Sequence, residues 1–139
     1  MRLLGSALST AGNAVFITDA KGRIEWANQS FTRMTGYSHE EVIGRNPRFL
    51  KSGIQPEAFY RQLWETISAG VTWSAEAIER HKEGHLFTVR QTVTPIRADD
   101  GHIKHFISIL EDITPQKEAE ARIYHMAQYD TLTELPNQS

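Results

Sequence analysis

Six histidines, three adjacent carboxylate pairs and one tryptophan-bearing apolar stripe are the residues of this chain whose types and spacing suit chemistry. Cysteine is absent, which excludes disulfides, Cys-ligated zinc, iron–sulfur clusters and Cys nucleophiles. The carboxylate pairs stand where a cap, a turn or a junction is expected: Glu40-Glu41, Asp99-Asp100 and Glu111-Asp112. No nucleophile elbow, phosphate-binding loop or His-Glu-x-x-His motif occurs. We therefore expect no enzymatic activity from this chain.

The histidines are candidates for a metal site. His81 and His85 flank a Lys-Glu-Gly turn and are expected to face each other, while His102 and His105 lie on a neighbouring hairpin. A metal site also needs a third ligand and an outer shell of hydrogen bonds. We expect solvated histidines that titrate near ~6.5, and we predict no metal site.

The apolar stripe predicts an amphipathic helix over residues 56–69, with these residues on one face: Phe59, Tyr60, Leu63, Trp64 and Ile67. Leu63 and Trp64 are candidates to line a ligand pocket, and ordinary core packing is the alternative. In the preceding loop, Asn46 and Arg48 either orient a polar ligand or satisfy the loop's own backbone groups. Pro47 between them stiffens the loop.

Asp112 and Thr114 stand where the last expected strand meets an outgoing helix. Asp112 is expected to accept amide hydrogen bonds at the helix start or to pair with a cation, which would set the helix angle. The alternative is a plain N-cap that stabilises the helix by ~1 kcal/mol.

The remaining pattern predicts the elements that position these residues. Strands are expected over residues 13–19, 23–27, 71–80, 85–96 and 103–110. Helices are expected from Asn28 to Gly36, from Ser38 to Gly44 through a capping box, and over residues 116–128. This order indicates an α+β fold, in which an antiparallel sheet carries helices on one face.

Length and charge bound the function further. The 139 residues suit one domain, and 15 Lys+Arg against 17 Asp+Glu give a net charge of -2. The sequence contains no run of basic residues of the kind that would indicate a nucleic-acid partner. No apolar stretch reaches the ~20 residues of a membrane span, and no signal peptide is recognised. We expect a cytoplasmic chain without direct membrane contact, although a larger parent protein can carry a membrane anchor.

An ordered set of short motifs closely resembles a PAS domain with its C-terminal segment. The motifs are Asn13–Asp19, Gly22–Ile24, Ala27-Asn28, Phe31, Thr35–Tyr37, Glu41–Asn46, Asp100-Gly101 and Glu111–Thr114. The resemblance implies a five-stranded antiparallel sheet with helices over one face and a pocket between them. It also implies a bacterial sensory module that binds small molecules and forms homodimers.

A second resemblance lies at the C-terminal end. Tyr129–Asn137 looks like the opening of a GGDEF domain, although Glu134 and Gln138 stand where that family has Gly and Arg. The resemblance implies a parent protein that is a diguanylate cyclase or a GGDEF/EAL protein of cyclic-di-GMP signalling. The expected organisation is a flanking segment (1–10), a PAS domain (11–114), a linker helix (115–128) and the start of a GGDEF domain (129–139).

The loop Gly44–Leu50 resembles the flavin loop of LOV domains, but the photoactive cysteine falls on Pro47, so no cysteinyl–flavin photocycle is possible. The flavin-binding amides of LOV domains fall on Glu79, Val89 and Leu110. The last two cannot form those hydrogen bonds, and an ionised Glu79 accepts but does not donate.

In the similar FAD-binding PAS domains of nitrogen-fixation sensors, the flavin-stacking Trp corresponds to Trp64. The ring-contacting carboxylate and amide of that family fall on Pro47 and Glu79. FAD or FMN is the leading candidate cofactor, although the ligand stays unidentified. Heme is disfavoured because the helix over residues 56–69 lacks histidine.

Together these observations predict a sensor whose ligand lies between sheet and helix. The expected binding residues are Phe16, Asn46, Arg48, Phe49, Leu63, Trp64, Glu79, Val89 and Ile107. A signal would leave through Asp112 and Thr114, turn the linker helix against its dimer mate and control a C-terminal effector. The alternative is a dimerisation module that binds no ligand, whose interior would lack a cavity of about 300 Å³.

Overall fold

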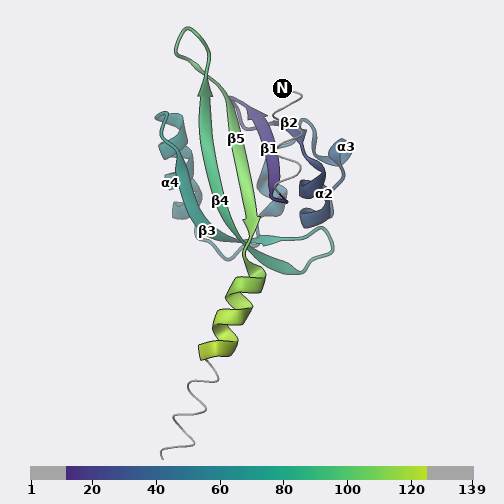
Figure 1. Ribbon diagram of the computed structural model, residues 1–139. Helices are drawn as coiled ribbons and strands as arrows, with labels where there is room; N and C mark the ends of the chain where they lie inside the picture. The colour runs from purple at the N-terminus through teal and green to yellow at the C-terminus, as the bar shows by residue number, and fades with distance from the viewer. Residues whose placement is uncertain (1–11, 125–139) are drawn as a thin grey trace, which may run out of the picture.

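The computed structural model describes residues 12–124 and contains one five-stranded antiparallel sheet. The strand order is β2-β1-β5-β4-β3, so the first and last strands, β1 and β5, pair in the middle of the sheet (Figure 1). The strands are β1 (Ala14–Asp19), β2 (Ile24–Ala27), β3 (Trp73–Arg80), β4 (Leu86–Arg97) and β5 (Ile103–Asp112). The expected α+β fold is confirmed.

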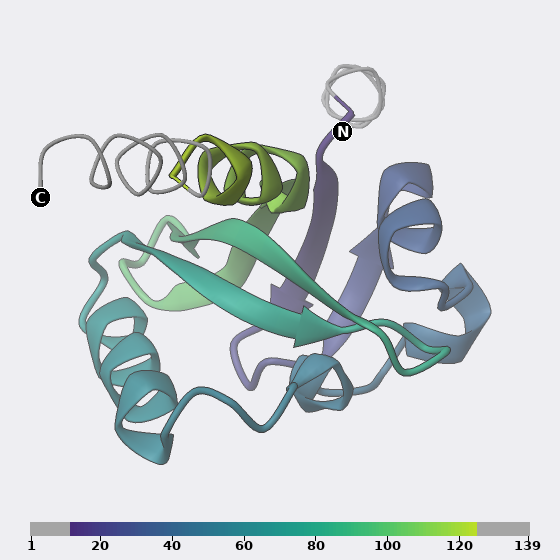
Figure 2. The same ribbon diagram turned by 90° about the horizontal axis from the view of Figure 1, so that it is seen from below.

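The connection between β2 and β3 contains all of the named helices, and Figure 2 shows them along one face of the sheet. They are α2 (Gln29–Thr35), α3 (His39–Val42), the 3₁₀ helix η1 (Pro47–Leu50) and α4 (Glu57–Ser68). Residues 114–124 form a further helix, which leaves from the end of β5. No helix within residues 12–124 is long and apolar enough to cross a membrane.

Local side-chain chemistry determines where these helices begin and end. Asn28 caps α2, because its Oδ1 accepts from the backbone N–H of Phe31. Gly36 ends α2 in the left-handed conformation (φ 82°), which glycine adopts without strain. Ser38 and Glu41 form the expected capping box of α3. The loop after Gly44 contains η1, which was not expected.

Two apolar clusters hold the helices against the sheet. The larger one joins β1 to α2, α3 and η1 through fully or almost fully buried side chains, including Phe16, Phe31, Val42 and Leu50. The smaller one joins Ile67 of α4 to Trp73, Val93 and Phe106. Burial of each large apolar side chain stabilises the fold by about 1.5–3 kcal/mol. The site described below lies between these two clusters.

The expected domain organisation is described only in part. The flanking segment 1–10 and the GGDEF-like residues 129–139 lie outside the described residues. The expected linker helix over residues 115–128 is described to residue 124, and that part is helical.

Candidate functional site

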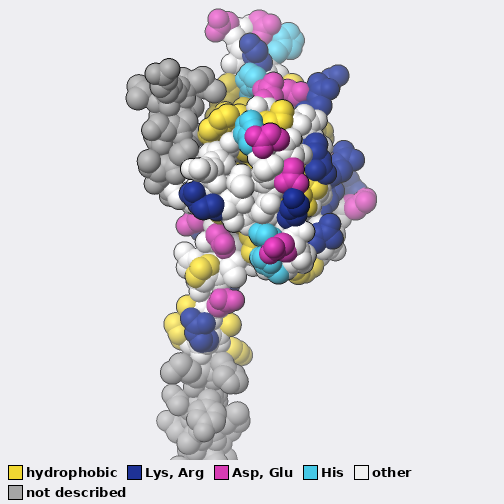
Figure 3. All heavy atoms as spheres, turned by 90° about the vertical axis from the view of Figure 1, so that its right-hand side faces the viewer, with side chains coloured by type: hydrophobic (Ala, Val, Ile, Leu, Met, Phe, Trp, Pro, Cys, Tyr) yellow, Lys and Arg dark blue, Asp and Glu magenta, His cyan; other side chains and the backbone are white. Residues whose placement is uncertain are grey.

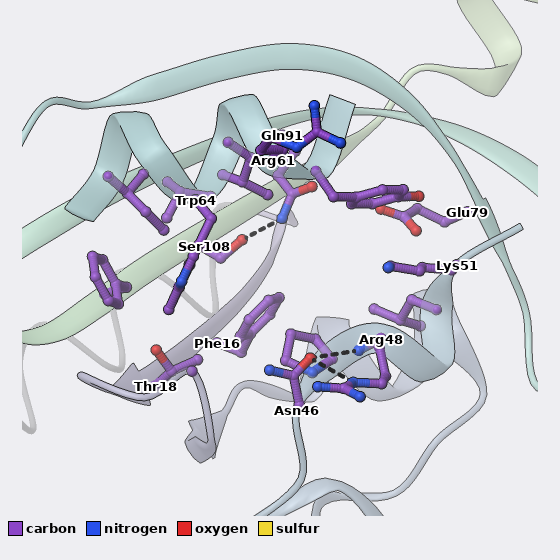
Figure 4. A pocket seen from close by; sticks show the side chains of 18 of the residues that line it. Phe16, Thr18, Asn46, Arg48, Lys51, Arg61, Trp64, Glu79, Gln91 and Ser108 are labelled. Atoms are coloured by element: carbon purple, nitrogen blue, oxygen red, sulfur yellow. Dashed lines mark hydrogen bonds between the residues drawn. The ribbon is translucent and has the colours of Figure 1, made fainter. Parts of the chain in front are cut away.

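A cavity of about 670 Å³ separates α4 and η1 from the sheet. Its walls come from β1, β3, β4 and β5 on one side and from α4 and the η1 loop on the other (Figure 4). This volume lies within the range of about 300–1,000 Å³ that is typical of small-molecule sites.

Six of the nine sequence-predicted binding residues line the cavity: Phe16, Asn46, Arg48, Leu63, Trp64 and Glu79. They come from four separate elements and loops, and only the fold brings them together. Phe49, Val89 and Ile107 do not line it, and each has a physical reason for lying elsewhere.

Phe49 packs edge-on against Tyr37 at 4.7 Å, and the guanidinium of Arg45 lies 4.6 Å from its ring centre. Val89 is fully buried in the larger apolar cluster and has no contact with the cavity. Ile107 lies on the opposite face of β5, because successive side chains of a strand alternate and its neighbours Phe106 and Ser108 both line the cavity. The sequence prediction therefore assigned the wrong set of alternating β5 side chains to the cavity.

Two polar residues that the sequence prediction missed lie on the sheet side of the cavity. Gln91 of β4 and Ser108 of β5 are joined by a hydrogen bond of 2.9 Å from the Gln91 Nε2 to the Ser108 Oγ. Each lies two residues from a buried apolar residue of the same strand, Val93 and Phe106 respectively. The signal that could have identified them is a polar residue at a strand position whose neighbours two residues away are apolar and buried.

Cations dominate the charged lining. Lys21, Arg48, Lys51 and Arg61 line the cavity, against the two carboxyl groups of Glu57 and Glu79. The positive charge attracts anionic groups toward the opening.

Asn46 positions one of these cations. Its Oδ1 accepts from the backbone N–H of Arg48 at 3.1 Å and from the Nε of Arg48 at 3.5 Å (Figure 4). The loop therefore satisfies its own backbone group, as one of the two alternatives predicted, and it also directs the guanidinium along the cavity.

Glu79 is the buried carboxyl group of the cavity. Only 7% of the residue is exposed, and its carboxyl group has no hydrogen-bond or ion-pair partner among the described residues. Burial without a compensating charge raises the pKa of Glu79 to about 8. At neutral pH this group is mostly a carboxylic acid, which both donates and accepts a hydrogen bond.

The opening of the cavity is formed where three segments meet. The Trp64 ring of α4 is 45% exposed and lies 5.6 Å from the ring centre of Phe106. At Gly22, in the β1–β2 turn, an added Cβ would lie 3.1 Å from the Nδ2 of Asn46 and 3.6 Å from the Trp64 ring. Trp64 is therefore a residue of the opening and not of the packed core.

The start of the outgoing helix is bound to β4. The Oδ1 of Asp112 accepts from the backbone N–H of Thr114 at 2.9 Å. The Oγ1 of Thr114 accepts from the N–H of Thr88 at 2.8 Å and donates to the carbonyl of Thr88 at 3.3 Å. One helical turn later, Lys117 forms an ion pair with Glu76 of β3 at 2.9 Å. The helix start is thus attached to the sheet at two points.

Comparison with known proteins identifies the family. The family model of the PAS domain matches residues 12–115. The nitrogen fixation regulatory protein of Klebsiella pneumoniae is 31% identical over 121 residues, which are 87% of this chain and 24% of that protein. Phototropin-2 of Oryza sativa subsp. japonica is 32% identical over 83% of this chain and 13% of that protein. A blue-light-activated histidine kinase of Brucella abortus is 34% identical over 66% of this chain and 19% of its own length.

Solved structures agree with these relatives. The structure of an RNA-binding light-oxygen-voltage receptor superimposes with a TM-score of 0.78 at 25% identity, and covers 95% of this chain and 38% of the receptor. A PAS domain of Colwellia psychrerythraea superimposes with a TM-score of 0.69 at 27% identity, over 82% of this chain and 97% of that domain. The chain spans about a quarter or less of the curated relatives it matches. It belongs to the PAS domain family of sensory modules.

Proposed function

We propose that this chain is the sensory part of a signalling protein and that its cavity binds a flavin nucleotide, FAD or FMN. The observation that carries the proposal is the cavity of about 670 Å³, which has aromatic and apolar walls, polar groups on the sheet side and four cations in its lining. A bound flavin supplies reversible redox chemistry and absorption of blue light.

The residues of the cavity suit the parts of such a ligand. Phe16, Leu63 and Trp64 provide apolar and aromatic surface for a planar ring. Gln91 and Ser108 provide an amide and a hydroxyl group for a polar ring edge, in place of the amides that LOV domains have at the positions of Val89 and Leu110. The cationic lining suits phosphate groups, to which Arg offers paired donors.

Relatives named as phototropin, blue-light-activated histidine kinase and nitrogen fixation regulatory protein support a flavin-type sensor. Because Pro47 replaces the photoactive cysteine, the signal cannot be the formation of a cysteinyl–flavin bond. We infer that redox change or ligand binding is the input.

The output is proposed to pass along β5. Ser108 and Phe106 line the cavity, and the same strand ends at Asp112, beside the attachment of the outgoing helix. In a homodimer, a change in the angle of that helix would alter the distance between two C-terminal effectors. The GGDEF-like residues 129–137 indicate that the effector is a diguanylate cyclase or a GGDEF/EAL protein.

Absorption spectroscopy of the purified chain tests the flavin proposal. The protein as isolated, or after addition of FAD or FMN, should absorb near ~450 nm with the band shape of a bound flavin. Gln91→Leu removes the amide that would bind the polar ring edge and should weaken binding by about tenfold, which corresponds to about 1.4 kcal/mol. Gln62→Leu, on the exposed surface of α4, is the matched control and should bind as the unaltered chain does. An absorption spectrum that neither nucleotide changes would exclude the proposal.

The alternative function is a homodimeric interaction module that binds no ligand. The cavity of about 670 Å³ argues against it, since an interaction module that binds no ligand has no need of an interior space of this size. A chain that dimerises in solution and binds neither nucleotide would favour this alternative.

A further inference from the structure

Three potential metal ligands gather at the turn between β3 and β4: His81, Glu83 and His85. One donor atom from each residue lies within 4.8 Å of the other two. Figure 3 shows histidine side chains beside carboxylates near the lower end of the folded domain, the region in which this turn lies in Figure 1.

The hairpin itself holds the two imidazoles together. The backbone N–H of His81 donates to the carbonyl of His85 at 2.9 Å, which makes these residues cross-strand neighbours. Their rings stack with centres 4.2 Å apart and an interplanar angle of 19°. Cross-strand Cβ atoms are about 4.5–5.5 Å apart, a separation that lets two imidazoles reach one ion.

A second contact limits the freedom of His81. A Cβ added at Gly36, after α2, would lie 2.5 Å from the Cε1 and 2.8 Å from the Nε2 of His81. The ring therefore lies directly against the backbone of Gly36 on one side and against His85 on the other. Its Nδ1 accepts from the backbone N–H of Glu83 at 3.0 Å, so its lone pair is already directed at the turn.

The charges of the turn also favour a cation. Lys82 is directed away from the cluster, because its Nζ pairs with Glu41 at 2.6 Å and its backbone N–H donates to Thr35. The carboxylate of Glu83 has no ion-pair partner among the described residues. It is therefore free to contribute a negative ligand.

We propose that His81, Glu83 and His85 form a binding site for a divalent transition-metal ion, with Zn²⁺ as the representative ion. Two imidazole nitrogens and one carboxylate oxygen, completed by water, are a ligand set that zinc accepts in four-coordinate sites. Ca²⁺ and Mg²⁺ are disfavoured, because they require oxygen ligands. The site is separate from the cavity and does not depend on the identity of the ligand bound there.

Binding requires only a local rearrangement. In a tetrahedral site with Zn–N distances of ~2.0 Å, the donor atoms lie about 3.3 Å apart. The donor atoms now lie within 4.8 Å of one another, and the exposed side chains of Glu83 and His85 can rotate to bring them to that distance. Coordination by His81 exchanges its hydrogen bond from the Glu83 amide for a metal–nitrogen bond.

Calorimetric titration of the EDTA-treated, 139-residue chain with ZnCl₂ tests the site. We expect saturable binding of one ion, and zinc should raise the melting temperature of the chain. Because loss of an outer-shell partner already weakens metal sites by about 10–100-fold, His85→Ala should weaken binding by at least about 100-fold. Glu83→Gln should weaken it by about tenfold or more, and the exposed positions of both side chains preserve the fold, which circular dichroism checks.

His102→Ala is the matched control. His102 also lies in a hairpin turn and pairs with a carboxylate, Asp100, at 3.0 Å, but among the described residues no third ligand atom lies close enough to complete a group of three there. The control should bind zinc as the unaltered chain does. The proposal is overturned if the chain binds no zinc saturably, if His85→Ala binds it with unchanged affinity, or if His102→Ala is the variant that loses binding.

Discussion

Glu79 illustrates how the fold alters the chemistry of a single residue. In water its carboxyl group is ionised at neutral pH, but in the cavity it is buried beside apolar side chains and has no cation within ion-pair distance among the described residues. Burial penalises the charged form and raises the pKa to about 8. The folded protein therefore keeps a proton that the unfolded chain releases.

This difference predicts a pH-dependent stability. The Glu79 contribution is fully present below the unfolded pKa of about 4.5 and is lost as pH rises toward the folded value of about 8. Between pH 5 and 8 the free energy of unfolding should fall by at most about 1.4 kcal/mol per pH unit from this residue. Glu79→Gln remains neutral, so its urea-unfolding free energies should lack this slope.

Both proteins should be measured at pH 5.5, 6.5 and 7.5 with EDTA present, so that no metal ion at the neighbouring turn contributes. All six histidines occur in both proteins, so the difference between the two pH profiles isolates Glu79. Parallel profiles would show that Glu79 ionises normally in the folded protein.

At the scale of elements, the start of the outgoing helix is defined by a hydroxyl group. The Thr114 hydroxyl both accepts from and donates to the backbone of Thr88. Beyond the end of β5, a residue of the helix therefore continues the hydrogen bonding to β4. The ion pair between Lys117 and Glu76 is exposed and contributes about 0–1 kcal/mol. The hydroxyl group is therefore the stronger attachment.

Thr114→Val keeps the side-chain shape and removes this hydroxyl, which leaves the partly buried N–H of Thr88 without its acceptor. We expect the free energy of unfolding to fall by about 1–3 kcal/mol, and the Thr88 amide to exchange faster with solvent. The control is Thr66→Val, whose hydroxyl bonds only to a carbonyl within α4. Equal effects of the two substitutions on stability and on exchange would refute a special role for Thr114.

At the scale of the whole molecule, the cavity and the outgoing helix share one strand. A ligand that favours one helix angle over another by roughly 30-fold shifts the equilibrium by about 2 kcal/mol. One buried hydrogen bond to a charged group can supply about that much. A small difference in ligand contacts at Ser108 or Phe106 would therefore be sufficient for the signalling through β5 that we propose.

Asp112→Ala in the longer protein that carries this chain tests that coupling. The substitution removes the acceptor for the Thr114 N–H at an exposed position, so the domain should stay folded. The activity of the C-terminal effector, proposed above to be a diguanylate cyclase, should then respond less, or not at all, to the state of the cavity ligand. Glu118→Ala, on the exposed surface of the same helix, is the control. A response equal to that of the unaltered protein would exclude coupling through Asp112.

The sequence by itself determined the features that depend on neighbours three or four residues apart. The caps at Asn28 and Ser38 are hydrogen bonds within one helical turn, and Gly36 ends α2 because of its own backbone freedom. Six cavity residues were also identified from the sequence, through the apolar stripe of α4 and through the resemblance to PAS and LOV domains.

The tertiary structure alone decided which alternate set of each strand faces the cavity. Ile107 was expected there, yet its neighbour Ser108 faces the cavity, because strand pairing and the helices packed on the sheet assign the faces. Val89 shares its face of β4 with Gln91 but lies farther along the strand, in the larger apolar cluster. It also decided that Glu79 keeps its proton. Burial depends on segments brought together in space, and the linear spacing of residues does not specify it.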